Sequence, residues 1–217
     1  MATRFYFPTT GTPDVEPNPS ASWGKTDGFD RITLVTSKIS SAFGTKAITE
    51  TSATSGYKVL FRQYIVRIGV VDFSSVTAKS QFRYSESDAG ANAYQYIICR
   101  VLNGSTLAER FSDPGRSGGQ EFVVNTLTNR QVATAVSFGG AVGSSTDGDY
   151  LVIELGAAFV NTDEAEFTAT VDLGDNSGSD LPTNSTETAQ YCPWIEFTND
   201  IPLYGAAAAT NVINMII

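Results

Sequence analysis

The feature that most constrains the fold of this chain is an alternation of apolar and polar residues with a period of two. In the segment 75–84, SVTAKSQFRY, small or apolar side chains occupy every second position, and polar or charged side chains lie between them. The segments 149–155 and 166–172 alternate in the same way. Successive side chains of a β-strand point to opposite faces, so each segment predicts a strand with one buried face. In 149–155 we expect the inward face to hold Leu151, Ile153 and Leu155, and the opposite face to hold Tyr150, Val152 and Glu154.

Two further segments, YKVLFRQYIV (57–66) and YQYIICRVL (94–102), are apolar on both faces. They predict central strands, or strands whose outer face meets another part of the molecule. Shorter candidate strands are 31–37, 106–111, 121–125, 131–138 and 194–198. Glycine-rich turn signals separate them, at Gly104, Pro114–Gly115, Gly118–Gly119, Gly139–Gly140 and Gly148. About ten short strands without a helical period predict an all-β protein, a single antiparallel β-sandwich of the jelly-roll type.

The two ends of the chain differ from its body. The segment 1–23 carries four prolines, and these prevent a regular hydrogen-bonded ladder. We expect it to form an extended arm across the sandwich, with Trp23 burying its large ring at the end of the arm. The sandwich domain is expected over 24–203, followed by an apolar tail over 204–217. Two alternatives stay open for the tail, which either folds back on its own sandwich or docks on a neighbouring subunit.

Charge and cysteine content exclude several classes of partner. The net charge is −9 with no cluster of Lys and Arg, which disfavours nucleic acid because an acidic surface repels phosphates. No apolar run is long enough to span a bilayer, and the N-terminal segment lacks the apolar core of a signal peptide, so we expect no membrane partner. Cys99 and Cys192 are too few for a disulfide scaffold, and we expect two buried thiols, with a Cys99–Cys192 bridge as the alternative.

The residues that usually carry catalysis are scarce. The chain contains no histidine, which removes Ser-His-Asp and Cys-His catalysis and histidine-ligated zinc. Carboxylates remain, and a glycosidase needs two of them across a cleft. The candidates are Glu86 and Asp88 in SESDAG, and Asp163, Glu164 and Glu166 in NTDEAEF. Their positions beside turns favour solvated loop acids, so we expect no catalytic residues, no cofactor and no enzymatic activity.

The long segment GDNSGSDLPTNSTETAQYCPWIEF (174–197) is the most site-like stretch. Its environment supplies the oxygen-bearing side chains Asp172, Asp175, Asn176, Asp180 and Asn184, the ligand type that calcium prefers. The spacing fails the EF-hand pattern, because the glycine position holds Asp180. We therefore expect no metal site, and interpret the segment as an ordered sheet-to-sheet crossover held by Asx turns. Its expected anchors are Leu181, Pro182 and Trp194, and any bound metal or ligand would be sought first at Asp175 and Asp180.

Carbohydrate binding is a second candidate activity, because sugar-binding modules present aromatic rings on a sheet face. The tyrosines available on predicted strands are Tyr57, Tyr64, Tyr84, Tyr94, Tyr96 and Tyr150. Aromatic residues at strand positions also serve as ordinary core or inter-subunit packing, and this is the expectation here.

Several stretches resemble a known group of proteins. The start MATRFYFPTTGTPDVEPNPSASW, the late block DLGDNSGSDLPTNSTETAQYCPWIEF, and the short stretches LFRQYIV and TNR are similar to small structural or hypothetical virion proteins of tailed bacteriophages. The resemblance implies a virion component, made in the host bacterial cytoplasm, with a jelly-roll or lectin-like sandwich and no enzymatic site. It gives no catalytic residues to transfer, and the tail from Gly205 onward lies outside it.

Two classes of function follow. The first is a non-enzymatic virion protein, a capsid decoration (cement) subunit or a neck or tail accessory, whose partners are other virion proteins and further copies of itself. Closed symmetry favours a trimer or dimer, and we expect residues 1–23 and 204–217 to carry much of the subunit contact. The alternative is a carbohydrate-binding jelly-roll module for host attachment. A polysaccharide lyase or hydrolase is disfavoured by the absence of histidine.

Overall fold

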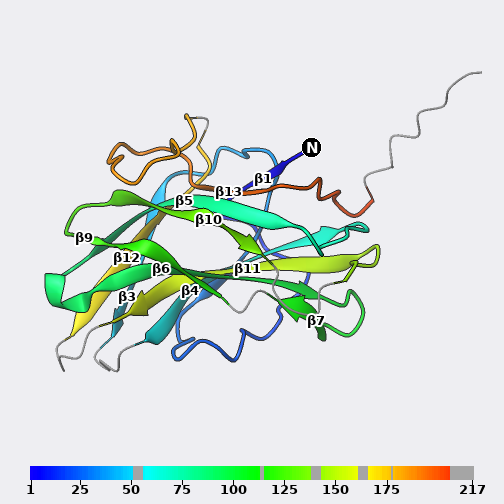
Figure 1. The fold of residues 1–217 in the computed structure, drawn as a ribbon, viewed down its shortest axis with the longest axis horizontal. Helices are drawn as coiled ribbons and strands as arrows, with labels where there is room; N and C mark the ends of the chain where they lie inside the picture. The colour runs from blue at the N-terminus through cyan, green and yellow to red at the C-terminus, as the bar shows by residue number, and fades with distance from the viewer. Residues whose placement is uncertain (51–55, 113–114, 138–142, 161–165, 177, 206–217) are drawn as a thin grey trace, which may run out of the picture.

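Strands make up the regular structure, and their arrangement is drawn in Figure 1. The structure is a computed structural model that describes residues 1–50, 56–112, 115–137, 143–160, 166–176 and 178–205. The strands are β1 (Thr3–Tyr6), β2 (Asp30–Thr33), β3 (Gly44–Glu50), β4 (Tyr57–Ile68), β5 (Thr77–Glu86), β6 (Ala93–Leu102), β7 (Glu109–Ser112), β8 (Arg116–Glu121), β9 (Val123–Val124), β10 (Thr128–Ser137), β11 (Asp149–Phe159), β12 (Phe167–Leu173) and β13 (Trp194–Phe197). One 3-10 turn, Ala89–Ala91, joins β5 to β6.

The strands form two packed sheets in jelly-roll order. The seven-stranded sheet contains β3-β12-β5-β10, with β13 and β1 continuing beside β5 and a short parallel pairing to β9. The six-stranded sheet contains β4-β11-β6, with β7 and β8 beside β6 and β2 parallel to β4. Successive strands β3, β4, β5 and β6 alternate between the sheets, as do β10, β11 and β12, which is the double Greek key of a jelly roll. The predicted all-β jelly-roll sandwich is confirmed, with two parallel pairings in otherwise antiparallel sheets.

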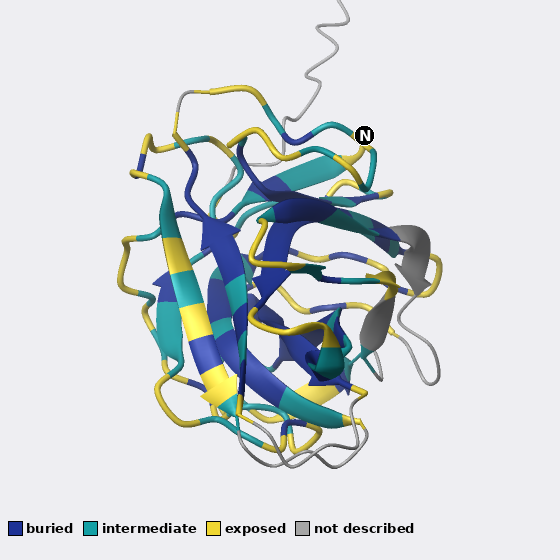
Figure 2. Cartoon of the chain, turned by 90° about the vertical axis from the view of Figure 1, so that its left-hand side faces the viewer, coloured by how far each residue is buried: buried dark blue, intermediate teal, exposed yellow. Residues whose placement is uncertain are grey.

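The periodic segments all became strands, but three strands have no counterpart in the sequence prediction. These are β1, β3 and β8. Strand β3 lies at a sheet edge, where Figure 2 shows its burial changing from residue to residue, and only Ile48 is fully buried. One buried residue leaves no hydrophobic pattern to detect. The parallel strand β2 ends at Thr33, four residues before the predicted end of its segment.

The N-terminal arm prediction needs a correction at its first residues. Residues 3–6 are strand β1, which pairs with β13 as part of the seven-stranded sheet. Phe5 and Phe7 are completely buried between the sheets, and Phe7 packs edge-to-face against Tyr64 and Phe82. The first residues of the predicted arm are therefore part of the core. The physical reason is that Phe5 and Phe7 alternate with polar neighbours before the first proline.

The rest of the arm lies against the six-stranded sheet. In Figure 1 the segment between β1 and β2 runs along the outer side of the six-stranded sheet. Trp23 packs there with Leu60, Tyr96 and Ile98, and its exposed fraction is 7%. Val15 packs on a second outer cluster formed by four residues, namely Ile65, Leu102, Tyr150 and Val152. The arm thus explains why β4, β6 and β11 are apolar on both faces.

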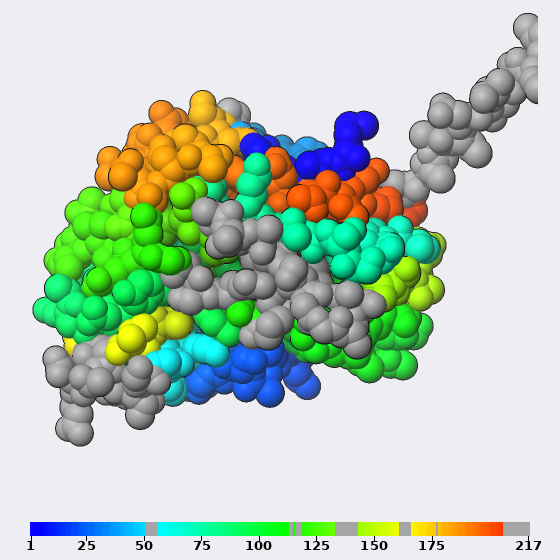
Figure 3. All heavy atoms as spheres, in the orientation of Figure 1, coloured from blue at the N-terminus to red at the C-terminus, as the bar shows by residue number. Residues whose placement is uncertain are grey.

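The segment 174–193 covers the opposite side of the molecule, as Figure 3 shows in orange. Its anchors behave largely as expected, since Leu181 and Trp194 are buried and Pro182 is half-buried. Asx turns at Asn176 and Asn184 hold it, as predicted. The connection is not a sheet-to-sheet crossover, however, because β12 and β13 both pair with β5 in the seven-stranded sheet. The chain leaves that sheet and returns to it, covering its outer face between the two strands.

The cysteines and the C-terminal end complete the fold. Cys99 on β6 and Cys192 before β13 are both buried and reduced, as predicted. The last described residues run beside the end of β4, where Leu203 forms a bridge with Ile68. Residues 206–217, most of the predicted tail, lie outside the described residues. In the part of the chain that is described, no helix has the length and apolar character needed to cross a membrane.

Candidate functional site

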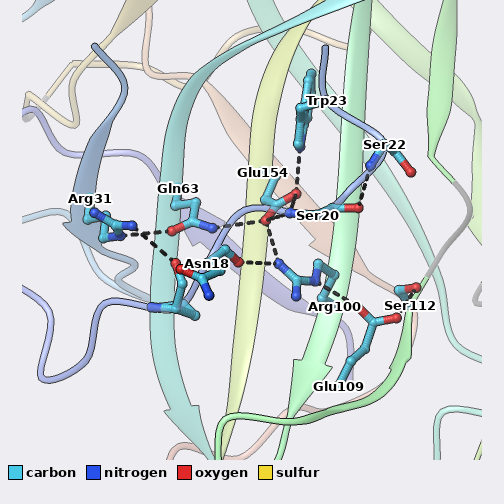
Figure 4. Close-up of polar contacts among 11 residues, drawn as sticks. Asn18, Ser20, Ser22, Trp23, Arg31, Gln63, Arg100, Glu109, Ser112 and Glu154 are labelled. Atoms are coloured by element: carbon cyan, nitrogen blue, oxygen red, sulfur yellow. Dashed lines mark hydrogen bonds and ion pairs between the residues drawn. The ribbon is translucent and has the colours of Figure 1, made fainter. Parts of the chain in front are cut away.

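A buried carboxylate, Glu154, is the centre of the most extensive polar network in Figure 4. It lies on the outer face of β11 with an exposed fraction of 0%. Its oxygens accept hydrogen bonds from the Trp23 indole N–H at 2.6 Å, the Gln63 amide at 2.9 Å and the Ser20 backbone N–H at 3.0 Å. The Arg100 guanidinium donates at 2.7 Å and supplies the opposite charge. We call these five residues the arm clamp, because two of them belong to the N-terminal arm.

Two arginines, Arg100 within the clamp and Arg31 beside it, extend the hydrogen-bond network to the arm backbone. Arg100 also donates to the backbone carbonyl of Asn18 at 2.9 Å, and to the carboxylate of Glu109 at 2.8 Å. On the other side, Arg31 donates to the side-chain oxygen of Gln63 at 3.2 Å and to the carbonyl of Pro17 at 3.2 Å. Side chains from β2, β6 and β11 thereby hold the backbone of the arm at Pro17, Asn18 and Ser20. The proline-rich segment cannot pair as a strand, so these contacts replace a ladder.

The chemistry of the arm clamp is structural. A buried carboxylate is tolerated when it is paired and its lone pairs are satisfied, and Glu154 receives donors on both oxygens. A general acid or base must instead reach a substrate proton. Here the carboxylate is covered by Trp23 and Ser20, so the arrangement anchors the arm and leaves no face of Glu154 for a substrate.

Sequence reasoning did not single out the arm clamp, although a signal was present. Glu154, Gln63 and Arg100 each interrupt an otherwise apolar segment. Glu154 is paired with Gln63 across β11 and β4, and Arg100 lies on neighbouring β6 opposite Val152. Isolated polar residues in apolar strands indicate a buried network, but their common location depends on strand register, which the sequence alone does not show.

The acids of the segment 172–184 are all committed to partners within the protein. Asp175 is completely buried and accepts hydrogen bonds from the Ile39 and Ser41 backbone N–H groups, at 2.5 and 2.7 Å. Asp172 pairs with the Arg83 guanidinium at 2.8 Å. Asn184 accepts from the backbone N–H groups of its own turn. These oxygens therefore act as caps and ion-pair partners.

Asp180 belongs to a chain of charges on the outer side of β1 and β13. Arg4 lies 2.6 Å from its carboxylate and Lys38 lies 2.7 Å from it. Arg4 also pairs with Glu196, and its guanidinium covers the ring of Trp194 at 4.0 Å. Partial burial acts to raise the pKa of Asp180, but hydrogen bonds from Lys38 and Arg4 outweigh it and lower the pKa. Two cations at this carboxylate occupy the position that a metal would need.

Of the remaining predicted acids, the structure describes Glu86, Asp88 and Glu166. Asp88 is exposed and caps the 3-10 turn by accepting from the Gly90 backbone N–H at 2.7 Å. Glu166 is exposed, whereas Asp163 and Glu164 lie outside the described residues. Within the described part of the chain, no three carboxylates or thiols gather in a metal-binding arrangement.

Glu86 differs from Asp88 and Glu166 because it is buried at the end of β5, with an exposed fraction of 2%. Its carboxylate accepts a hydrogen bond from the Ala93 backbone N–H at 2.8 Å. Burial raises the pKa of Glu86 to about 7, and the neighbouring carboxyls of Glu121 and Asp88 add to this, although the Ala93 hydrogen bond opposes it. The group therefore titrates near neutral pH.

Replacing Glu86 with Gln is expected to stabilise the protein at pH 8 and to leave its stability near pH 4.5 almost unchanged. The folded state holds the proton more tightly than the unfolded state, whose ordinary pKa is 4.5. Glu86 therefore destabilises the fold as the pH rises from 4.5 through about 7, by up to about 3 kcal/mol. Urea unfolding at pH 4.5, 6 and 8 measures the difference. Glu16→Gln is the control, since that side chain is 74% exposed, and a Glu86→Gln difference that stays constant with pH contradicts the prediction.

The tyrosines proposed as a sugar-binding surface are mainly packing residues. Tyr64, Tyr84, Tyr96 and Tyr150 are buried, whereas Tyr57 and Tyr94 are half-buried. Tyr64 and Tyr84 lie between the sheets, and Tyr96 and Tyr150 lie under the covered outer face of the six-stranded sheet. The expectation of ordinary packing is confirmed for the buried four, which present no open aromatic platform.

The fold and the arm clamp define a jelly-roll β-sandwich whose six-stranded sheet is partly covered on its outer face by the chain's own N-terminal segment. No family model and no curated protein matches the chain. Two solved structures of infectious bursal disease virus are similar to it. The Gt strain structure shares 7% identity over 88% of this chain, with a TM-score of 0.34. The Gx strain structure shares 8% over 84%, with a TM-score of 0.31.

This chain spans less than half the length of those viral chains, covering 46% and 44% of them. At TM-scores of this size the likeness carries no argument about function. The assignment to the jelly-roll class rests on the strand order of the protein's own two sheets.

Proposed function

We propose that this protein is a non-enzymatic structural component of a tailed-bacteriophage virion, either a capsid decoration (cement) subunit or a neck or tail accessory. The observation that carries the proposal is the commitment of the acids and aromatics to internal contacts. Glu154, Asp172, Asp175 and Asp180 all hold segments of the chain together. A particle protein has to be a rigid block, and a sandwich covered on both outer faces by its own chain suits that role. The resemblance of segments 1–23 and 172–197 to phage virion proteins supplies the biological setting.

In this proposal the two ends of the chain have different roles. The apolar side chains of segment 1–23 pack on the protein's own sandwich, through Phe5, Phe7 and Trp23. The arm therefore packs on the outer face of its own six-stranded sheet. The proposal therefore assigns the contact with neighbouring subunits to residues 204–217.

Quantitative mass spectrometry of purified virions tests the proposal. A shell protein is expected at about hundreds of copies per particle, and a neck or tail protein at about a dozen or fewer, because each position repeats with the symmetry of its assembly. Absence from purified particles contradicts the proposal. A glycan array with and without a calcium chelator is the companion measurement, and specific binding there favours the carbohydrate-binding alternative instead.

A further inference from the structure

The described chain ends beside a pocket on the outer face of the six-stranded sheet. The pocket has a volume of about 280 Å³, and its lining includes Ile65, Tyr150, Leu203 and Tyr204, with Pro13 from the arm. Ile65 and Tyr150 are buried core residues of the outer cluster, so the floor is apolar. The pocket lies where the arm and the C-terminal segment come together without covering the sheet completely. A space of this volume accommodates one or two aliphatic side chains.

The described chain ends beside an occupied part of the β4 edge. The Tyr204 backbone N–H donates to the carbonyl of Arg67 at 3.1 Å, beside the end of β4. The next carbonyl along this edge belongs to Ile65 and accepts from Leu34 at 2.9 Å. The next position on this edge of β4 is therefore already paired with Leu34. Gly205 follows with a φ of +74°, a left-handed conformation that glycine adopts without strain and that turns the chain.

The sequence beyond this turn combines a small-residue stem with a bulky apolar end. The stem is AAAATN (206–211), and the end is VINMII (212–217). The stretch from Gly205 to Val212 spans up to about 25 Å when extended. The pocket, in contrast, is lined by Tyr204 itself. To reach the pocket of its own subunit, the apolar end of the tail has to fold back along the whole stem. An extended stem instead places the apolar end within reach of a neighbouring subunit.

We propose that the apolar end of the tail, residues 212–217, of one copy docks in this pocket on a second copy of the chain. The tail and the pocket are different surfaces, so the contact is heterologous and closes into a ring when the rotation between copies permits. The inference rests on the proposed role as an assembling virion subunit and names the contact that joins the copies. It is tested in solution, separately from the presence of the protein in virions.

The experiment uses two variants that are each defective on one side of the contact. The first is the chain with residues 206–217 deleted, which keeps the pocket. The second is the full chain with Thr33→Trp, which fills the pocket from its wall. Asp14→Trp is an alternative block at an exposed position of the same lining, and it avoids disturbing the fold. Light scattering coupled to size-exclusion chromatography gives the mass of each variant and of their mixture, and circular dichroism melting confirms that each is folded.

The wild-type chain is expected to be an oligomer, and each variant alone a monomer, a fall in mass of at least twofold. Mixing the two is expected to restore a one-to-one dimer, because the tail of the pocket-blocked chain enters the open pocket of the tail-less chain. A monomeric wild type overturns the proposal, as does an oligomer that survives both changes. If the tail docks on its own subunit, the wild type is a monomer. Tail deletion then lowers its melting temperature by the same amount at every protein concentration, and this outcome also overturns the proposal.

Discussion

Replacement of Glu154 with Gln is expected to lower the free energy of unfolding by about 3 kcal/mol, because it breaks a buried ion pair. The Arg100 guanidinium, 9% exposed at its side chain, loses the charge that lies 2.7 Å away. Both oxygens of Glu154 accept hydrogen bonds from N–H groups of the protein. Glutamine replaces one of these oxygens with an NH2 group, which is itself a donor and therefore faces another donor. Chemical denaturation at pH 7 measures the loss.

The matched control for this substitution is Glu109→Gln, which removes the other carboxylate on Arg100. The Glu109 side chain is 41% exposed, so solvent screens its pair and the expected loss stays below about 1 kcal/mol. Limited proteolysis provides an independent readout, because a weakened clamp exposes the backbone of the arm near Ser20. Equal losses for the two variants, or an arm that is cleaved no faster in Glu154→Gln, contradict the assignment of Glu154 as the centre of the clamp.

Replacement of Phe7 with Ala is expected to cost about 3–5 kcal/mol, the range for removing a buried aromatic ring from a packed core. Phe7 has an exposed fraction of 0%, and its ring centroid lies 4.7 Å from that of Tyr64 and 4.6 Å from that of Phe82. Neighbouring backbone fixes its position, since the carbonyl of Phe7 accepts from the Gly174 N–H at 2.9 Å. The cavity that the substitution creates would lie between the two sheets. Thermal and urea unfolding of the purified variant measure the loss.

Tyr6→Ala is the control for Phe7, because Tyr6 belongs to β1 but points to the other face. It is half-buried, and its hydroxyl donates to Asp180 at 3.2 Å. We expect it to cost about 1–2 kcal/mol, the sum of one hydrogen bond and partial burial. If Phe7→Ala costs no more than Tyr6→Ala, the start of the chain is an external arm and its placement in the core is wrong.

The strand pattern of the body was predictable because it is local. In β11 the sequence assigned Leu151, Ile153 and Leu155 to one face, and these residues lie in the core between the sheets. The same pattern placed Glu154 on the outer face, which is also observed. The alternation reports which side chains share a face, and this follows from the geometry of a single strand. Edge strand β3 was missed because one buried residue makes no pattern.

The roles of the acids were not predictable in the same way. Asp175 is as suitable for calcium as for a backbone cap when only its neighbours in sequence are considered. Its actual partners are Ile39 and Ser41, and the latter lies 134 positions away in the chain. The choice between ligand and cap depends on which donors long-range folding brings to the carboxylate. The two acids named as first places to seek a metal, Asp175 and Asp180, both turned out to hold distant segments.

The amino-acid sequence by itself determined the all-β class, the position of most strands and the inner face of each, because period-two alternation is enforced by burial along one strand. It also determined that Trp23 ends an extended proline-rich segment. Only the tertiary structure decided that residues 3–7 join the core, that segment 174–193 returns to the sheet it leaves, and that Glu154 binds the arm. These outcomes depend on strand order and register between distant segments, which a local pattern does not contain.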